Sequence, residues 1–388
     1  MTKRSSATAL ASFLLVGCAG LAAAQSWTEY PSDPIYVPYA PGQMTSYYPS
    51  VVLDPDRFSG HGSAATYKMW HQAPGGIALS TSADGIDWTL VGSTNLSGAL
   101  HPCVLYDAGG FGGGSYYYKV WFWTGVAGTT PDVIQTSVST DGLTWLTPQP
   151  VTQSATQPIV DGVNPGYFYH LYGPGFLIYN PSATSAPGEP LTFPYVMYYD
   201  TSSEGSGPGT SVEQIALATS TDGIMWTRVG SAPVLIPLGA GSDWDGTYAF
   251  RPSVVNVRGT WQMYYSGSNH AIDPGTTVPY AHGIGLATST DGVSWTRDPD
   301  NPVFSYADGV AWRNTRTYTP PVVLSYQLGC LQMWFSGATG LGSGTSSGIG
   351  YATLCGVLEQ VVPASSALGL ALLALLVVVL GWLALRSG

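Results

Sequence analysis

A seven-residue phrase that occurs four times constrains the fold of this 388-residue chain more than any other feature. Each copy reads Ser-x-Asp-Gly-x-x-Trp, and the copies span residues 82–88, 139–145, 220–226 and 289–295. Successive Asp-Gly pairs lie 57, 81 and 69 residues apart. This spacing is too long for a solenoid rung but suits a four-stranded unit with loops of variable length. The sequence therefore predicts a fold built from repeated β units.

The segments around the four copies follow one order. A short apolar strand opened by proline comes first, at residues 49–52, 102–105, 174–177 and 252–255. An aromatic-rich strand comes next, at residues 67–70, 118–121, 195–198 and 261–264. A third strand ends in the phrase and a fourth follows its tryptophan, so the phrase forms a hairpin. The Asp-Gly pair favours a type I′ turn, in which both central residues have positive φ.

A further unit at the C-terminal end is incomplete. Residues 319–324, 331–335 and 349–353 repeat the first three strands, but neither the phrase nor a fourth strand follows. The missing strand occurs at the other end of the chain, where residues 27–36 closely parallel residues 295–304. We expect this N-terminal strand to complete the last unit and close a ring, which removes exposed sheet edges.

Composition agrees with this organisation. The 49 glycines, 29 prolines and 9% charged residues fit many short strands joined by turns. The fold class predicted for residues 25–357 is therefore all-β, a five-bladed β-propeller closed by the N-terminal strand. One C-terminal transmembrane helix is expected in addition.

Both ends of the chain have the character of targeting segments. Residues 1–24 have a basic start, an apolar stretch and an alanine-rich end, which is the pattern of a secretory signal peptide. Residues 15–18, Leu-Val-Gly-Cys, offer a lipoprotein signal as the alternative. Residues 358–366 form a linker, and the hydrophobic segment 367–388 is long enough to span a bilayer. We expect an exported protein, at the cell surface or outside the cell.

The tail from Val362 to Arg386 resembles bacterial C-terminal sorting signals of the PEP-CTERM and IPTL-CTERM kind. This resemblance implies a location in the bacterial envelope and a sorting protease as a partner. The membrane would be contacted through the C-terminal helix. A plain transmembrane anchor is the alternative.

The cysteines fit an oxidising compartment. Cys330 precedes the second strand of the last unit and Cys355 ends its third, so antiparallel pairing would bring the two together. We expect a disulfide between them, in place of the absent Asp-Gly turn. Cys103 is expected to be buried as a small apolar residue.

Charge and residue spacing exclude several kinds of partner. The formal net charge of −11 argues against nucleic acid, whose binding needs a basic face. No Cys/His spacing suggests a metal site, and no motif suggests a cofactor. Abundant aromatic residues with few charges suit a polyhydroxylated ligand, because sugar C–H faces stack on aromatic rings.

Residues 263–267 (Met-Tyr-Tyr-Ser-Gly) and 333–337 (Met-Trp-Phe-Ser-Gly), each followed by Ile-Gly-x-Ala-Thr, carry a family resemblance. The repeated unit resembles the five-bladed glycoside hydrolase-like superfamily, which includes arabinanases, levansucrase, invertase and mannoside phosphorylases. The resemblance covers about residues 26–357. It implies a propeller that acts on or binds carbohydrate. It also implies catalytic carboxylates in the central funnel, several of them beside the prolines of the innermost strands.

The residues that precede these prolines in this chain are not acidic. They are Tyr48, His101, Gly173, Arg251 and Thr319. Hydrolysis of a glycosidic bond needs two carboxyl groups, one as an acid and one as a base or nucleophile. The pattern therefore favours binding over hydrolysis.

We expect a sugar, as oligosaccharide or polysaccharide, to contact Tyr48, His101, Tyr172, Asp200 and Arg251 at the mouth of the funnel. Polar groups at positions that are elsewhere apolar need either a partner or a ligand. A satisfied structural role is the competing interpretation for each of these residues.

Asp161, Asp243 and Asp245 lie in the segments that lead into the innermost strands, and they are the candidate catalytic acids. Capping of turns by these carboxylates is the alternative. Two hypotheses for function follow. The first is a surface-displayed propeller that binds glycans or is glycoside hydrolase-like. The second is a non-catalytic structural or adhesive module of the envelope or matrix.

Overall fold

The structure, a computed structural model, describes residues 26–39, 48–58, 65–124, 133–163, 166–186, 188–203, 212–239, 244–269, 283–305, 311–314, 316–338 and 347–357. These residues form an all-β fold in which no α-helix occurs. Short 3-10 helices lie at η1 (Phe111–Gly113), η2 (Pro190–Thr192) and η4 (Ala311–Arg313).

Antiparallel pairing divides the strands into consecutive groups. The first group is β2 (Ser50–Leu53), β3 (Tyr67–Ala73), β4 (Gly76–Ser82) and β5 (Trp88–Ser97). The second is β6 (Leu100–Tyr106), β7 (Tyr118–Trp123), β8 (Ile134–Ser139) and β9 (Gln149–Pro150). The third is β11 (His170–Tyr179), β12 (Tyr195–Ser203), β13 (Val212–Ser220) and β14 (Met225–Arg228), with β10 (Thr152–Gln153) parallel to β14. The next is β15 (Tyr248–Val257), β16 (Thr260–Ser268), β17 (Gly283–Ser289), β18 (Thr296–Arg297) and β19 (Phe304–Ser305). The last is β20 (Arg316–Tyr318), β21 (Val322–Ser325), β22 (Cys330–Ala338), β23 (Ser347–Cys355) and β1 (Thr28–Glu29).

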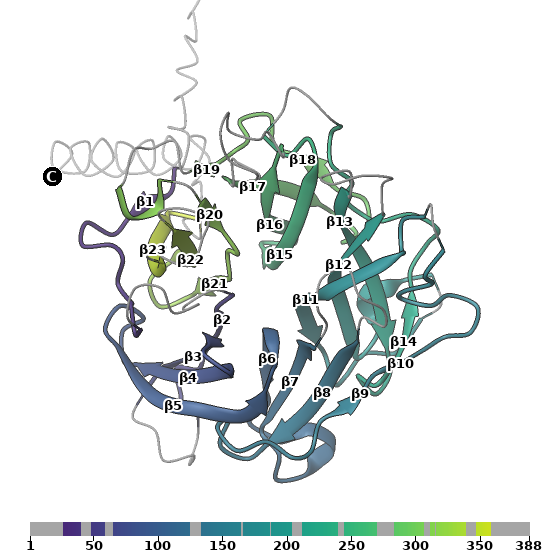
Figure 1. Cartoon of the computed structure of the whole chain (residues 1–388), viewed down its shortest axis with the longest axis horizontal. Coiled ribbons are helices and arrows are strands. Elements are labelled where there is room, and N and C mark those ends of the chain that lie inside the picture. The colour runs from purple at the N-terminus through teal and green to yellow at the C-terminus, as the bar shows by residue number, and fades with distance from the viewer. Residues whose placement is uncertain are drawn as a thin grey trace, which may run out of the picture.

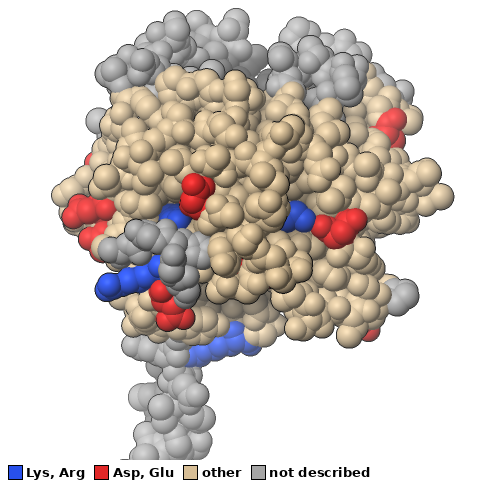
Figure 2. All heavy atoms as spheres, turned by 90° about the horizontal axis from the view of Figure 1, so that it is seen from below, with Lys and Arg blue, Asp and Glu red and all other residues tan. Residues whose placement is uncertain are grey.

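The groups stand side by side around a common axis, with the first strand of each at the centre (Figure 1). The core lies between neighbouring groups. One apolar cluster, for example, packs Trp121 of β7 against Met197 of β12 and Trp226 of β14. The edge of the ring seen in Figure 2 carries few charged side chains and no continuous basic patch.

The N-terminal strand closes the ring, as its resemblance to residues 295–304 predicted. In β1, Thr28 pairs with Thr353 of β23 and Glu29 pairs with Ala352. Glu29 also forms an ion pair of 2.6 Å with the buried Arg313. The first strand of the chain is thus held by the last group.

The repeated phrase does not form a type I′ turn, so that expectation was wrong. Only the glycine has positive φ, for example Gly85 at 82°, and the aspartate does not. The carboxylate of Asp84 instead accepts hydrogen bonds of 2.8 Å from the N–H groups of Ile86 and Asp87. An aspartate that caps the following residues in this way needs no left-handed backbone of its own.

Each turn is also bound by the neighbouring group. The carbonyl of its glycine accepts a hydrogen bond from an aromatic side chain of an adjacent second strand. These bonds are Trp70 to Gly142 (2.7 Å), Trp121 to Gly223 (2.8 Å), Tyr198 to Gly292 (2.7 Å) and Trp334 to Gly85 (2.7 Å). The phrase therefore serves to join groups, as well as to connect strands.

The last group lacks the phrase and is closed differently. The structure has the disulfide between Cys330 and Cys355, at paired ends of β22 and β23. Trp27, from the N-terminal segment, packs edge-on against Tyr264 of the preceding group, with ring centroids 5.3 Å apart. Cys103 is a buried free thiol.

The predicted leader 1–24, linker 358–366 and hydrophobic segment 367–388 lie outside the described residues. Within the described part of the chain, no helix is long and apolar enough to cross a membrane.

We expect Gly142→Ala to lower the free energy of unfolding by about 2–4 kcal/mol. Gly142 has a φ of 81°, and an added Cβ would lie 2.7 Å from the Trp70 ring. Gly75→Ala is the matched control, because Gly75 has a similar φ of 85° with no atom within 4 Å of an added Cβ. The control should cost only about 1–2 kcal/mol for the left-handed backbone. Equal urea midpoints for the two variants would show that close packing between the turn at Gly142 and Trp70 of the neighbouring group does not stabilise the fold.

From the raised pKa of Asp33 we predict that the closed ring becomes less stable as the pH rises. Burial, with a smaller contribution from Glu29, raises the pKa of this carboxyl from 3.8 to about 7, although the N–H of Tyr351 and the charge of Arg313 oppose the shift. Because the folded state favours the protonated acid, its contribution is complete below the unfolded pKa and is lost as the pH rises through about 7. Urea midpoints should therefore fall between about pH 4 and pH 7. The Asp33→Asn variant should show a shallower slope, because only the contribution of Asp33 is removed and Glu213, whose pKa burial also raises to about 7, remains. An unchanged slope would contradict the assignment.

Candidate functional site

The residues that precede the innermost prolines share an unusual backbone conformation. The φ values are 58° at Tyr48, 52° at His101, 118° at Gly173, 52° at Arg251 and 53° at Thr319. Positive φ is uncommon outside glycine, and a residue before proline normally adopts an extended conformation. Strained backbone of this kind persists only where the surroundings enforce it, and it is concentrated at functional sites.

Side chains of neighbouring groups enforce this conformation through hydrogen bonds to the strained N–H groups. The pairs are Arg251 with Asp200 Oδ1 (2.8 Å), Thr319 with Ser266 Oγ (2.8 Å) and Tyr48 with Ser336 Oγ (3.3 Å). Asp200, Ser266 and Ser336 lie at equivalent places toward the ends of β12, β16 and β22. Asp200 is thus an acid where the last two groups have serine, and the equivalent residues of the first two groups are Gln72 and Trp123.

The second oxygen of Asp200 holds the side chain of Arg251. The distance from Asp200 Oδ2 to Arg251 Nη1 is 2.5 Å, and both side chains are buried. The same Nη1 donates to the carbonyl of Tyr172 at 3.0 Å. Asp200 therefore both supports the strained backbone and neutralises the guanidinium.

The cluster around Arg251 is completed by three ring side chains, those of His101, Tyr48 and Trp123. His101 Nδ1 lies 2.7 Å from the carbonyl of Tyr172, and His101 Nε2 lies 3.4 Å from Arg251 Nη2. Burial and the charge of Arg251 hold the pKa of His101 well below its usual value. The neutral ring therefore donates through Nδ1 and accepts from Arg251 through Nε2.

Aromatic rings surround these polar groups. The Tyr48 and His101 rings are 4.0 Å apart, and the Arg251 guanidinium carbon is 4.9 Å from the centre of the Tyr48 ring. Trp123 stacks on His101 at 5.4 Å. The partly exposed rings of Tyr48 and Tyr172 provide the apolar faces on which a sugar could stack. We call Tyr48, His101, Tyr172, Asp200 and Arg251 the axial cluster.

Glu213 joins the axial cluster and was not predicted. It lies in β13, paired with Ser202 and, across to the next group, with Tyr248. Burial raises the pKa of Glu213 to about 7, with Arg251 opposing and Asp200 reinforcing the shift. This carboxyl can therefore hold or release a proton near neutral pH.

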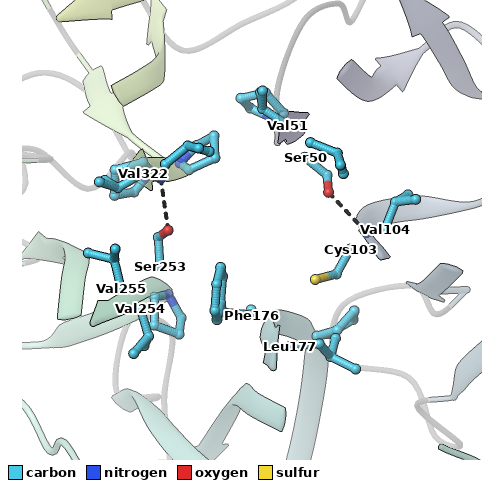
Figure 3. Close-up of a pocket in the computed structure, with 18 of the residues that line it drawn as sticks. Ser50, Val51, Cys103, Val104, Phe176, Leu177, Ser253, Val254, Val255 and Val322 are labelled. Carbon is cyan, nitrogen blue, oxygen red and sulfur yellow. Dashed lines mark hydrogen bonds between the residues drawn. The ribbon is translucent and has the colours of Figure 1, made fainter. Parts of the chain in front are cut away.

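A cavity of about 450 Å³ runs along the axis between the innermost strands, and Tyr48, His101 and Arg251 belong to its wall. Its other residues are mostly apolar, among them Val51 and Phe176 (Figure 3). Two hydrogen bonds link neighbouring strands across this wall, from the N–H of Val104 to Ser50 Oγ (3.0 Å) and from Val322 to Ser253 Oγ (2.8 Å) (Figure 3). The cavity is therefore walled by strands that are joined to one another.

The candidate catalytic acids do not join the axial cluster. Asp161 is on the surface, 3.5 Å from Arg228 Nη1. Asp245 is fully buried, and its Oδ2 accepts from Arg297 Nε at 2.8 Å and from the Tyr265 hydroxyl at 2.9 Å. Asp243 lies outside the described residues.

Two members of the site had no strong signal in the sequence. Glu213 precedes Ile215 in a strand that the pattern did identify, but its position toward the axis follows from pairing with β12. Trp123 stands where the other groups have Gln72, Asp200, Ser266 or Ser336, so an alignment of the repeats would have identified it. No group of three or more His, Cys, Asp or Glu within the described residues is arranged to hold a metal ion.

Asp200→Asn should destabilise the fold by about 3–5 kcal/mol, because it leaves the Arg251 charge buried without its counter-ion. The measurement is the free energy of unfolding in urea. Ser266→Ala is the control, since it removes a neutral hydrogen bond at the equivalent position and should cost about 1 kcal/mol. The double variant Asp200→Asn/Arg251→Met should recover part of the loss. If the two single variants cost the same, the ion pair is not the important interaction.

Comparisons with known proteins identify the fold. No protein-family model matches the sequence, and no curated protein matches it. Among solved structures, a thermostable family-43 glycoside hydrolase aligns with a TM-score of 0.53 and 17% identity, over 81% of this chain and 91% of that chain. An N-acetylgalactosamine deacetylase from F. plautii, in complex with blood group B trisaccharide, aligns with a TM-score of 0.54 and 15% identity, over 85% and 94%.

A third similar structure comes from work on the GH130 family of mannoside phosphorylases and its hydrolases of β-1,2 mannosidic linkages in Candida mannan. Its TM-score is 0.53 at 13% identity, over 86% of this chain and 94% of that chain. At these identities the likeness concerns the fold, and function must be argued from the site. The chain has the all-β, propeller-like fold of glycoside hydrolases.

Proposed function

We propose that this protein binds carbohydrate at the axial cluster. The observation that carries the proposal is the convergence of Tyr48, Tyr172 and Arg251 at one end of the axis, on a fold shared with glycoside hydrolases. Aromatic faces beside charged hydrogen-bonding groups suit a ligand with C–H faces and hydroxyl groups. The similar structure with a bound blood group trisaccharide supports a glycan as the class of ligand.

We also infer that the groups are the blades of a five-bladed propeller. Strands β10 to β19 belong to one ten-stranded sheet, and a single pair, Glu213 with Tyr248, joins two of the groups within it. Separating the sheet at this pair leaves β11–β14 and β15–β19 as units like the others. The N-terminal strand completes the last blade.

The carboxyl groups of the cluster favour binding of a sugar over hydrolysis of a glycosidic bond. A glycosidase needs two carboxyl groups, about 5–9.5 Å apart, with separate roles. Asp200 is occupied by Arg251 through both oxygens, which leaves Glu213 as the available carboxyl among the described residues of the cluster. A single titratable acid can form a hydrogen bond with a sugar hydroxyl, but it cannot serve as both the acid and the base or nucleophile that hydrolysis needs.

Export is part of the proposal. The predicted leader 1–24 and hydrophobic segment 367–388 would present residues 25–357 outside the cytoplasm, on the bacterial envelope. The Cys330–Cys355 disulfide supports an oxidising compartment.

The test is retention of a mixed oligosaccharide panel on the immobilised protein, with mass analysis of the effluent. Retarded, intact sugars are expected, and shorter products would instead establish a glycosidase. Tyr172→Ala should weaken binding by about tenfold, because it removes a ring but keeps the carbonyl that holds His101 and Arg251. Tyr326→Ala is the control, since Tyr326 is 77% exposed on the β21–β22 hairpin. No retention of any sugar would favour a structural or adhesive module.

A further inference from the structure

Arg316 brings a second guanidinium to the axial cluster. It begins β20 and is partly buried, two residues before Tyr318, whose ring packs edge-on against Tyr48 at 5.9 Å. Burial raises the pKa of Tyr48, and the charges of Arg251 and Arg316 act in the opposite direction. Both guanidinium groups are therefore within electrostatic range of the Tyr48 hydroxyl.

Among the residues that the structure describes, Arg316 differs from the other buried or partly buried arginines in having no counter-ion. Arg228, Arg251, Arg297 and Arg313 each form an ion pair with an aspartate or glutamate. No such pair is formed by Arg316 with any described residue, and its buried Nε lacks a hydrogen-bond partner. A charge removed from water normally has a partner, so this guanidinium has capacity for an anion.

Arg251 also has an Nε–H group without a hydrogen-bond partner among the described residues. Its side chain is 8% exposed. Its two terminal nitrogens are engaged by Asp200, Tyr172 and His101. Arg251 and Arg316 thus each have a buried Nε–H group that lacks a hydrogen-bond partner among the described residues.

The charges of the site do not balance. Arg251 and Arg316 contribute two positive charges and Asp200 one negative charge, while His101 is neutral because burial and Arg251 lower its pKa. Glu213, with a pKa of about 7, is only partly ionised at neutral pH. The described residues of the site therefore carry excess positive charge within a chain whose formal net charge is −11.

We propose that the glycan bound at the axial cluster is acidic, with a carboxylate or sulfate group held by Arg316 and Arg251. This inference rests on the proposed carbohydrate function. A guanidinium presents a planar set of donors that matches the oxygens of carboxylate and sulfate groups, and such charge-assisted bonds are stronger than neutral ones. The tyrosine rings of the cluster then contact the sugar faces.

Glu213 gives this site a characteristic pH dependence. It shares the site with Asp200, Arg251, Tyr48 and His101, and of these Glu213 titrates near neutrality. Protonation below about pH 7 removes a negative charge from the site, whereas a uronate or sulfate stays ionised. Affinity for an acidic glycan should therefore rise as the pH falls from about 8 to 6.

The experiment is titration calorimetry of the full chain with three matched trisaccharides: a uronic-acid trisaccharide, its carboxyl-reduced neutral counterpart, and a sulfated counterpart of the neutral sugar. At least one acidic sugar should bind about tenfold tighter than the neutral one, and the stronger of the two identifies the acidic group. Arg316→Gln should reduce that affinity to the neutral level. Arg258→Gln is the control, because it removes the same charge from an exposed turn.

The outcomes separate the two proposals. Equal affinity for neutral and acidic sugars, or selectivity that survives Arg316→Gln, would overturn the acidic-glycan inference and leave carbohydrate binding intact. Binding of none of the three sugars would count against both. Thermal melting establishes that each variant is folded, and Arg316→Lys, which keeps the charge, should retain part of the selectivity. In Glu213→Gln the pH dependence between about 6 and 8 should disappear, and its persistence would contradict the role of Glu213.

Discussion

The structure depends on a hydrogen bond that joins each group of strands to a neighbour. An aromatic N–H or O–H, such as that of Trp121, reaches the glycine carbonyl of the repeated turn in the adjacent group, here Gly223. The bond requires a glycine with little space above it and an aspartate that caps the turn, so both residues recur together. Small sheets that could not bury their faces alone are thereby stacked into one ring with a continuous core.

The axial cluster depends on one position of the repeat, near the end of the second strand of each group. Ser266 and Ser336 accept the N–H of a strained residue in a neighbouring group, and Asp200 does the same for Arg251. The additional oxygen of Asp200 introduces a buried ion pair where Ser266 and Ser336 make a neutral contact. The position that supports a strained backbone in the last two groups therefore also holds the guanidinium of the site in the third group.

Local patterns in the sequence predicted the strand order, the ring closure, the Cys330–Cys355 pairing and the positions of His101 and Arg251 beside the innermost prolines. The turn type could not be predicted in this way, because the side chain of Asp84 satisfies N–H groups that the rule for Asp-Gly hairpins ignores. Glu213 was missed because its approach to Arg251 depends on pairing between strands that are distant from Arg251 in sequence. Asp245 was a candidate catalytic acid because it precedes an innermost strand, whereas its burial against Arg297 depends on tertiary packing.

Closure by the N-terminal strand has a consequence for how the molecule forms. Glu29 and Arg313 are separated by 284 residues, so β1, the first of the described strands, is among the last to be paired. Joining segments so far apart costs loop-closure entropy, which is offset only by the contacts of the finished ring. Folds rich in such contacts form slowly. Until β23 exists, β1 has no partner and the growing array keeps an open edge. A chain truncated before β23 therefore lacks the strand with which β1 pairs, and its ring stays open.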